Sequence, residues 1–224
     1  MDGIKNMIYG MKGGDLVFLA GRPDMGKTRF ALKIASDLAA EKNVACFYYS
    51  MQELTEEIEE TLDMIGGEGT CKRPALYVED DIWLDMEEVY AQIRKHKEEN
   101  RIGLAVIDSF TLFIGHLLPE FGGQAVSKTL SELKKLALEL DIPIMVLQCL
   151  DAECERRKDK RPELSDIGMM QDMGDVVIFL YRDECYNIDT PTPGILEITI
   201  AKNVNGDTAS SKIGFSGGRF SDAV

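Results

Sequence analysis

One segment, Gly21-Arg22-Pro23-Asp24-Met25-Gly26-Lys27-Thr28, constrains the fold of this chain more than any other. It has the phosphate-loop pattern of Gly, four variable positions, Gly, Lys and Ser or Thr. An apolar run at residues 16–20 precedes it, and a helical pattern over residues 28–40 follows it. This strand–loop–helix context predicts a nucleoside triphosphate site. The alternative is a Gly-rich turn that binds no ligand.

The residue types of this loop explain how it would bind a triphosphate. Gly21 and Gly26 can adopt positive φ angles and let the backbone approach a ligand closely. Backbone N–H groups then converge at the positive end of a helix. Lys27 can reach the outer phosphates, and the Thr28 hydroxyl can bind Mg²⁺. We expect the loop and the residue after it to contact the nucleotide: Gly21, Arg22, Pro23, Asp24, Met25, Gly26, Lys27, Thr28 and Arg29.

A second candidate for the same site is Asp108, which follows the apolar run 104–107. A carboxylate at the C-terminal end of a buried strand is placed where a group that holds Mg²⁺ belongs in such a fold. The alternative is a strand-end Asp that caps the next turn.

Length and charge narrow the class of protein. A chain of 224 residues can bury one good core, which favours a single domain. The formal net charge of −14 argues against a generally basic nucleic-acid surface. Five Cys with no CxxC pair indicate neither a zinc site nor a disulfide framework. No apolar stretch approaches the roughly 20 residues of a membrane span, and the N-terminus lacks a signal-peptide core. We therefore expect a cytoplasmic chain with no membrane partner.

Short apolar runs alternate with helical patterns along the chain. We expect strands at 16–20, 44–49, 75–78, 104–107, 144–147, 176–181, 195–201 and 212–215, and helices at 28–40, 54–65, 84–100 and 124–140. This alternation predicts an α/β fold with a mostly parallel central sheet flanked by helices. The strand-rich last third, with an Asn205-Gly206 turn, predicts an antiparallel C-terminal extension. We expect flexible stretches at 117–123, 151–172 and 183–194.

Several segments resemble the DnaB-type replicative helicases, in the order of that family. Besides the phosphate loop with Phe30-Ala31, they are residues 13–16, 50–58, 133–144, 159–162, 165–166 and 179–184. The resemblance covers nearly the whole chain. It implies a single RecA-like P-loop NTPase domain over residues 1–224, similar to the C-terminal motor domain of such a helicase. The family's N-terminal scaffold domain has no counterpart in this sequence.

The resemblance also implies a function: ATP-driven translocation on single-stranded DNA, and its unwinding, by a homo-oligomeric ring that is a hexamer in the family. ATP and Mg²⁺ are the implied cofactors, held by Lys27, Thr28 and Asp108. Lys202 matches the lysine that approaches the nucleotide of the adjacent subunit. The loop 155–165 matches one that faces the central channel, where basic groups contact DNA phosphates. Those groups are Arg156, Arg157, Lys158, Lys160 and Arg161.

Tyr181 and Arg182 follow a buried strand, at a place that can border the nucleotide base in this fold. Either side chain could stack on the base. Tyr181 could equally be core filler.

The sequence departs from the family pattern where hydrolysis is concerned. The water-activating glutamate of the family falls on Gln52, and an amide can orient water but cannot take its proton. Glu53 is adjacent, but alternation along a strand would point it to the opposite face. The arginine finger falls on Val204, and such an arginine is worth about 10³–10⁵ in rate. The strand-end glutamine appears at Gln148, with Cys149 at the strict register.

Two hypotheses therefore stay open. In the first, the chain is a helicase motor domain that binds ATP·Mg²⁺, and its hydrolysis is either weak or rescued by other groups that the sequence does not identify. In the second, it is a non-hydrolysing nucleotide-binding paralogue that serves as an interaction or regulatory module of a replication complex. A RecA-like recombinase or clock-type ATPase would share the fold but would not be expected to show the series at 159–184. A small-molecule phosphotransferase is disfavoured because no arginine-rich lid follows the loop.

Overall fold

The computed structural model describes residues 10–66 and 75–221, with the side chains of 116–122 left out of the description. Its longer elements are β1 (Leu16–Gly21), α2 (Lys27–Lys42), β2 (Ala45–Ser50), α3 (Thr55–Gly66), β3 (Leu76–Glu79), α4 (Met86–Asn100), β4 (Ile102–Asp108), α5 (Phe110–Leu140), β5 (Ile144–Cys149), β6 (Val176–Tyr181), β7 (Ile195–Asn203), β8 (Ala209–Ser216) and β9 (Arg219–Ser221). Most of these bounds agree with the expected ones; the exceptions are the early starts of α5 and β8, and β9, which the sequence pattern did not predict.

The strands form one nine-stranded sheet in the order β3-β2-β4-β5-β1-β6-β7-β8-β9. The six strands from β3 to β6 in that order are parallel, and β7, β8 and β9 continue the sheet in antiparallel pairs. Every residue of β1 and of β6 is buried, as expected for parallel strands covered on both faces. The mixed sheet predicted from the sequence is confirmed.

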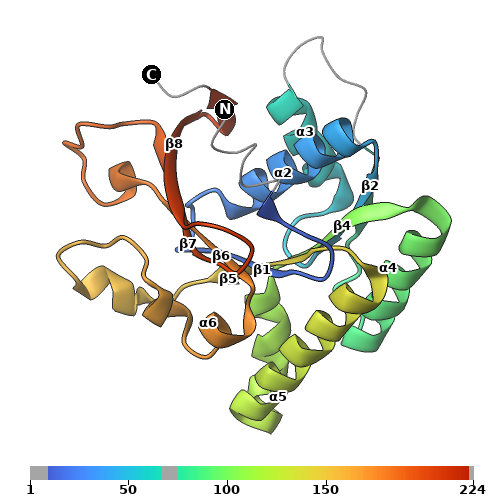
Figure 1. Cartoon of the computed structure of the whole chain (residues 1–224). Coiled ribbons are helices and arrows are strands. Elements are labelled where there is room, and N and C mark those ends of the chain that lie inside the picture. The colour runs from blue at the N-terminus through green and yellow to red at the C-terminus, as the bar shows by residue number, and fades with distance from the viewer. Residues whose placement is uncertain (1–9, 67–74, 222–224) are drawn as a thin grey trace.

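Helices cover both faces of the sheet, and each face has its own apolar core (Figure 1). On one face, α2 and α3 pack through Phe30, Leu38 and Ile58. On the other, α4 and α5 pack through Val89, Ile93 and a row of α5 side chains. Alternating residues of one strand serve the two cores, because successive side chains of a strand point to opposite faces. The sheet is thereby held rigidly between two layers, and its strand ends become fixed attachment points.

Helix α5 begins much earlier than the sequence pattern predicted. It runs from Phe110 to Leu140, and the range 117–123, expected to be flexible, is part of the helix. The Ser109 side chain accepts a hydrogen bond from Leu112 N at 3.3 Å and caps the first turn. Phe110, Phe113 and Ile114 are buried against the sheet. Tertiary packing of this first turn outweighs the low helix propensity of the one Pro and two Gly in 117–123.

The other two stretches expected to be flexible contain short helical turns. Residues 151–172 include turns at Ala152–Arg156 and Leu164–Ile167 and the start of α6 (Met170–Met173), and residues 183–194 include a turn at Asp183–Cys185. Within residues 10–66 and 75–221, no helix has both the length and the apolar character needed to cross a membrane.

Candidate nucleotide-binding site

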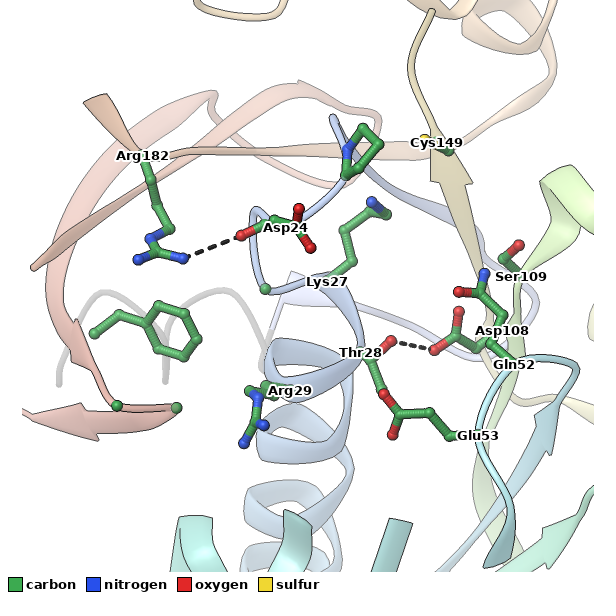
Figure 2. A pocket seen from close by; sticks show the side chains of 15 residues that line it. Asp24, Lys27, Thr28, Arg29, Gln52, Glu53, Asp108, Ser109, Cys149 and Arg182 are labelled. Atoms are coloured by element: carbon green, nitrogen blue, oxygen red, sulfur yellow. Dashed lines mark hydrogen bonds between the residues drawn. The ribbon is translucent and has the colours of Figure 1, made fainter. Parts of the chain in front are cut away.

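A cavity of about 610 Å³ lies at the C-terminal ends of the parallel strands (Figure 2). The loop after β1, the segment after β2, the end of β4 and the end of β5 each contribute to its wall. Ligand sites of open parallel sheets form at this edge, because the strand ends converge there. Nine of the residues that the sequence singled out line it, whereas Gly21, Arg22 and Met25 of the phosphate loop do not.

The phosphate loop leads from β1 into α2 with the backbone conformation that its glycine predicts. Gly26 has φ of 88° and precedes the first turn of α2. A Cβ atom on Gly26 would lie 3.0 Å from the ring of Phe215, so a larger residue would also require that ring to shift by a few tenths of an ångström. Asp24 has φ of 62°, an uncommon conformation for a residue with a side chain. The N–H groups at the start of α2 have no partner within the helix and can bind an anion.

Lys27 lies over the loop, where its ammonium group can meet a phosphate. Its Nζ donates a hydrogen bond to the Arg22 carbonyl oxygen at 3.0 Å. Burial lowers the pKa of Lys27, although the negative charges of Asp108 and Asp24 oppose that shift. The charge is therefore held in a desolvated place that a bound triphosphate would stabilise.

Asp108 and Thr28 meet at the bottom of the cavity, as the sequence predicted for a metal site. Thr28 Oγ1 donates to Asp108 Oδ2 at 2.5 Å, and Tyr48 Oη, from β2, donates to the same oxygen at 2.7 Å. Burial raises the pKa of the Asp108 carboxyl group, and the two hydroxyl donors oppose that rise.

This pair of oxygen groups fits Mg²⁺, which is bound in proteins by few side chains together with water and phosphate. In the described part of the chain, no cluster of three or more His, Cys, Asp and Glu side chains could hold a metal ion. A cation at Thr28 and Asp108 would therefore need the phosphates of a nucleotide as further ligands.

Gln52 and Glu53 both line the cavity, which corrects the expectation that they point to opposite faces. That expectation assumed a strand, but β2 ends at Ser50 and residues 51–53 form a bend. Strand alternation does not apply to a bend, so neighbouring side chains can share one side. Burial and the negative charge of Asp108 raise the pKa of Glu53.

Tyr181 and Arg182, the two candidates for contact with the base, direct their side chains to different hollows. Arg182 lines the cavity; its Nη1 donates to the Asp24 carbonyl oxygen at 3.0 Å, and its guanidinium lies 4.9 Å from the centre of the Phe215 ring. The Tyr181 ring instead stacks on Tyr186 at 5.8 Å and lines a second hollow. Of the pair, only Arg182 is in reach of a ligand in the main cavity.

At the end of β5, Cys149 lines the cavity and Gln148 does not. Gln148 is buried, and its Oε1 has no hydrogen-bond partner in the described part of the chain. The two side chains leave opposite faces of the strand. The position at the end of β5 that faces the cavity therefore carries a thiol.

Lys202 and Val204 are not part of this cavity wall. Lys202 lies on β7, and its Nζ donates to the Gln171 carbonyl oxygen at 2.6 Å. Val204 is 60% exposed in the turn after β7. Lys202 and Val204 thus lie at the end of β7 and just after it, and neither lines the nucleotide cavity of its own chain.

The basic loop at 155–165 is less free than its composition suggested. The three arginines are paired with carboxylates: Arg157 with Asp166 at 2.7 Å, Arg161 with Glu197 at 2.7 Å, and Arg156 with Glu153 at 2.8 Å. Lys160 lies over the Tyr186 ring at 4.8 Å, and Lys158 is exposed. The positive field of this loop therefore rests mainly on the two lysines.

Sequence reasoning missed several residues that build the site. Tyr48 lies inside a strand that reads as plain core, so nothing in its local pattern marks it as a partner of Asp108. Phe215, Gly217 and Gly218 come from the C-terminal hairpin, which is about 190 residues from the loop that it covers. The Gly-Gly pair at 217–218 is a sequence signal for a tight turn. In the structure both residues have positive φ angles.

A family model described as the DnaB-like helicase C terminal domain matches residues 1–65 and 53–221. The replicative DNA helicase DnaB of Geobacillus stearothermophilus is 34% identical over 95% of this chain and 53% of its own length. The replicative DNA helicase DnaC of Bacillus subtilis is 32% identical over the same shares.

The chain thus spans about half the length of the curated relatives it matches. Among solved structures, an ATPase domain that is 24% identical covers all of this chain and 91% of its own, with a TM-score of 0.87. A structure of a DnaB-like replicative helicase is 25% identical, with a TM-score of 0.82, over 94% of this chain and 57% of its own.

Proposed function

The chain belongs to the DnaB-like helicase C-terminal domain family, and on that premise we propose that it is an ATP-binding motor domain that acts on DNA as part of a ring. One observation carries the proposal: Lys27 and Thr28, at the start of α2, and Asp108, at the end of β4, line one cavity at the phosphate loop. These residues are the phosphate-binding and metal-binding set that a triphosphate site of this fold requires.

In this proposal each residue has a distinct task. The N–H groups at the start of α2 and the ammonium of Lys27 hold the phosphates. Thr28 and Asp108 hold Mg²⁺, which when bound neutralises charge on the phosphates. Tyr48 keeps the carboxylate of Asp108 oriented through its 2.7 Å hydrogen bond. Arg182 and Phe215 lie at the outer end of the cavity, where the nucleoside would be.

Residues outside the cavity would contact the neighbouring subunit of the ring and the DNA. Lys202 lies outside the cavity of its own chain; to reach the nucleotide of a neighbouring subunit, its ammonium would exchange the 2.6 Å hydrogen bond to the Gln171 carbonyl oxygen for a phosphate. Lys158 and Lys160 are the groups that would contact phosphates of single-stranded DNA in the central channel. Hydrolysis is expected to be slow, because Val204 supplies no positive charge where the family has an arginine finger.

A second candidate function is that of a regulatory module that binds ATP without hydrolysing it. Gln52, Val204 and the paired arginines of the basic loop would all suit a module that binds ATP without turnover and regulates a helicase complex. The two functions differ in what single-stranded DNA does. A motor domain hydrolyses ATP faster when DNA is added, whereas a regulatory module does not respond.

Two measurements test these functions on the same protein. Calorimetry with ATP and Mg²⁺ measures binding, and phosphate release with and without single-stranded DNA measures turnover. Magnesium-dependent binding with DNA-stimulated release is the result expected of the motor. Binding with no release supports the regulatory module. Absence of binding at millimolar nucleotide would refute both.

A further inference from the structure

The bend after β2 places a second candidate next to Gln52 in the cavity. We propose that Glu53 is the carboxylate that takes a proton from the attacking water during ATP hydrolysis, in place of the glutamate that the family pattern puts at position 52. The inference rests on the proposed function, because it assigns a residue to the hydrolysis step of that same site.

The position of Glu53 is held by hydrogen bonds on both sides of the bend. Ser50 Oγ accepts a hydrogen bond from Glu53 N at 3.1 Å and donates one to the Glu53 carbonyl oxygen at 2.6 Å. Met51 N donates to the Asp108 carbonyl oxygen at 2.6 Å, which ties the bend to the end of β4. The backbone that carries Glu53 is therefore attached directly to the residue that would hold Mg²⁺.

The side chain of Glu53 extends from this bend toward the start of α2 (Figure 2). It lines the cavity together with Thr28 and Asp108 and is half-buried there. The next acidic side chains are used elsewhere: Glu57 accepts a hydrogen bond from Leu54 N at 2.8 Å in the first turn of α3, and Glu56 is exposed. Within the acidic run 53–60, Glu53 is thus the member that belongs to the cavity.

The electrostatic setting of Glu53 suits a base. Burial and the charge of Asp108 raise its pKa above the ordinary value, while the guanidinium of Arg29 works in the opposite direction. A carboxylate oxygen can accept a proton from a water molecule, and the Glu53 carboxylate lines the cavity together with the metal-binding pair. Gln52 has no proton-accepting group of comparable basicity, although its amide can hold a water molecule in place.

The other two carboxylates of the cavity are less suited to this task. Asp108 Oδ2 already accepts two hydrogen bonds, from Thr28 and Tyr48, and the group is assigned to the metal. Asp24 lies in the phosphate loop, on the side of Arg182 (Figure 2). Of the three, Glu53 alone lies beside the metal-binding pair without a hydrogen-bonding task there.

The proposed reaction is hydrolysis of the bond between the γ-phosphorus and the oxygen that bridges to the β-phosphate. The water oxygen forms a bond to the γ-phosphorus, and the bond from that phosphorus to the oxygen bridging to the β-phosphate breaks. The electron pair of the broken bond stays on ADP. One proton of the water goes to the Glu53 carboxylate and then to bulk solvent, which leaves ADP and inorganic phosphate.

The first test compares Glu53→Gln with the matched control Glu56→Gln, an exposed carboxylate three residues away. Glu53→Gln is expected to lower turnover of ATP by about 10²–10⁴-fold, the range for loss of a general base. Calorimetry with a non-hydrolysable ATP analogue and Mg²⁺ should give affinities within about threefold for the two variants and the parent, because the phosphate-binding groups are intact. Glu53→Asp should retain part of the turnover.

The second test measures whether a bound nucleotide analogue covers the Glu53 carboxylate, and it does not depend on turnover. Carbodiimide coupling of an amine to carboxylates, mapped by mass spectrometry, is compared with and without the bound analogue. Glu53 should be protected by the analogue while Glu56 is modified equally in both samples. Turnover of Glu53→Gln equal to that of the parent, or equal modification of Glu53 in both samples, would overturn the inference. If the parent binds no nucleotide, calorimetry reports failure of the proposed function separately.

Discussion

At the scale of single residues, the site combines groups that are costly to the empty protein. Lys27 is partly desolvated, and its one hydrogen bond from Nζ in the described chain goes to the Arg22 carbonyl oxygen. Asp108 is 3% exposed, and burial raises its pKa. Groups that are unfavourable alone become favourable when a triphosphate and a cation arrive, which is the usual relation between a binding site and the stability of its fold.

Replacement of Lys27 by Ala should therefore have opposite effects on binding and on stability. Affinity for ATP·Mg²⁺ should fall by at least tenfold, because a charged hydrogen bond is worth about 1.5–3 kcal/mol. The free energy of unfolding of the nucleotide-free protein should stay equal or rise. Calorimetry and urea titration measure the two quantities, with the exposed Lys42→Ala as control. A loss of stability in Lys27→Ala would contradict the explanation that burial of the Lys27 charge destabilises the empty site.

At the scale of elements, the basic loop is attached to the sheet more firmly than a channel loop made of free charges would be. Arg161 pairs with Glu197 on β7, and Lys212 on β8 reaches the same carboxylate at 2.8 Å. The Glu197 side chain is 12% exposed. The loop is thus positioned by ion pairs that use up most of its arginine charge.

The Glu197 cluster should make stability depend on pH in a defined direction. The hydrogen bond from Arg161 lowers the pKa of Glu197 below 4.5 in the folded state. A carboxyl group with a lowered folded pKa stabilises the fold above its unfolded pKa and loses that contribution as pH falls through the folded value. Glu197→Gln should cost about 1 kcal/mol at pH 7, and its unfolding free energy should approach that of the parent as pH falls below 4.5. Urea titrations at a series of pH values measure this, with the exposed Glu41→Gln as control.

Binding of single-stranded DNA should depend on the two lysines more than on the arginines. The double change Lys158→Ala with Lys160→Ala should reduce the slope of log affinity against log salt by about 1.4, because each contact to single-stranded phosphate contributes about 0.7. Arg156→Ala, which removes an arginine paired with Glu153, should change the slope less. Fluorescence anisotropy with a labelled oligonucleotide at several salt concentrations measures both. The reverse order of effects would show that the ion pairs open on binding.

At the scale of the whole molecule, the proposed ring would divide each nucleotide site between two chains, with the phosphate loop on one and Lys202 and Val204 on the other. Lys202 and Val204 lie on the antiparallel extension, away from the cavity of their own chain. The proposed ring would bring this extension to the cavity of the next subunit. Activity would then depend on assembly as well as on the fold.

Val204→Arg should raise DNA-stimulated turnover by orders of magnitude, within the range of about 10³–10⁵ that such an arginine supplies. Because Val204 is 60% exposed, the change should leave the fold intact. The gain should grow with protein concentration, since the arginine would act on a neighbouring subunit. Val204→Gln, polar but uncharged, is the control. A gain that is independent of concentration would place the arginine at its own cavity instead.

The amino-acid sequence alone determined the phosphate loop, the order of strands and helices and the mixed sheet. Each of these follows from local pattern, because a loop motif and an apolar period are set by neighbouring residues. The tertiary structure decided what distant segments do: Tyr48 on Asp108, Phe215 over Gly26, the early start of α5, and the separation of Tyr181 from Arg182. It also placed the side chains of Gln52 and Glu53 in the same cavity. The reason is that the end of β2 is set by hydrogen bonds to β4 that no local pattern reveals.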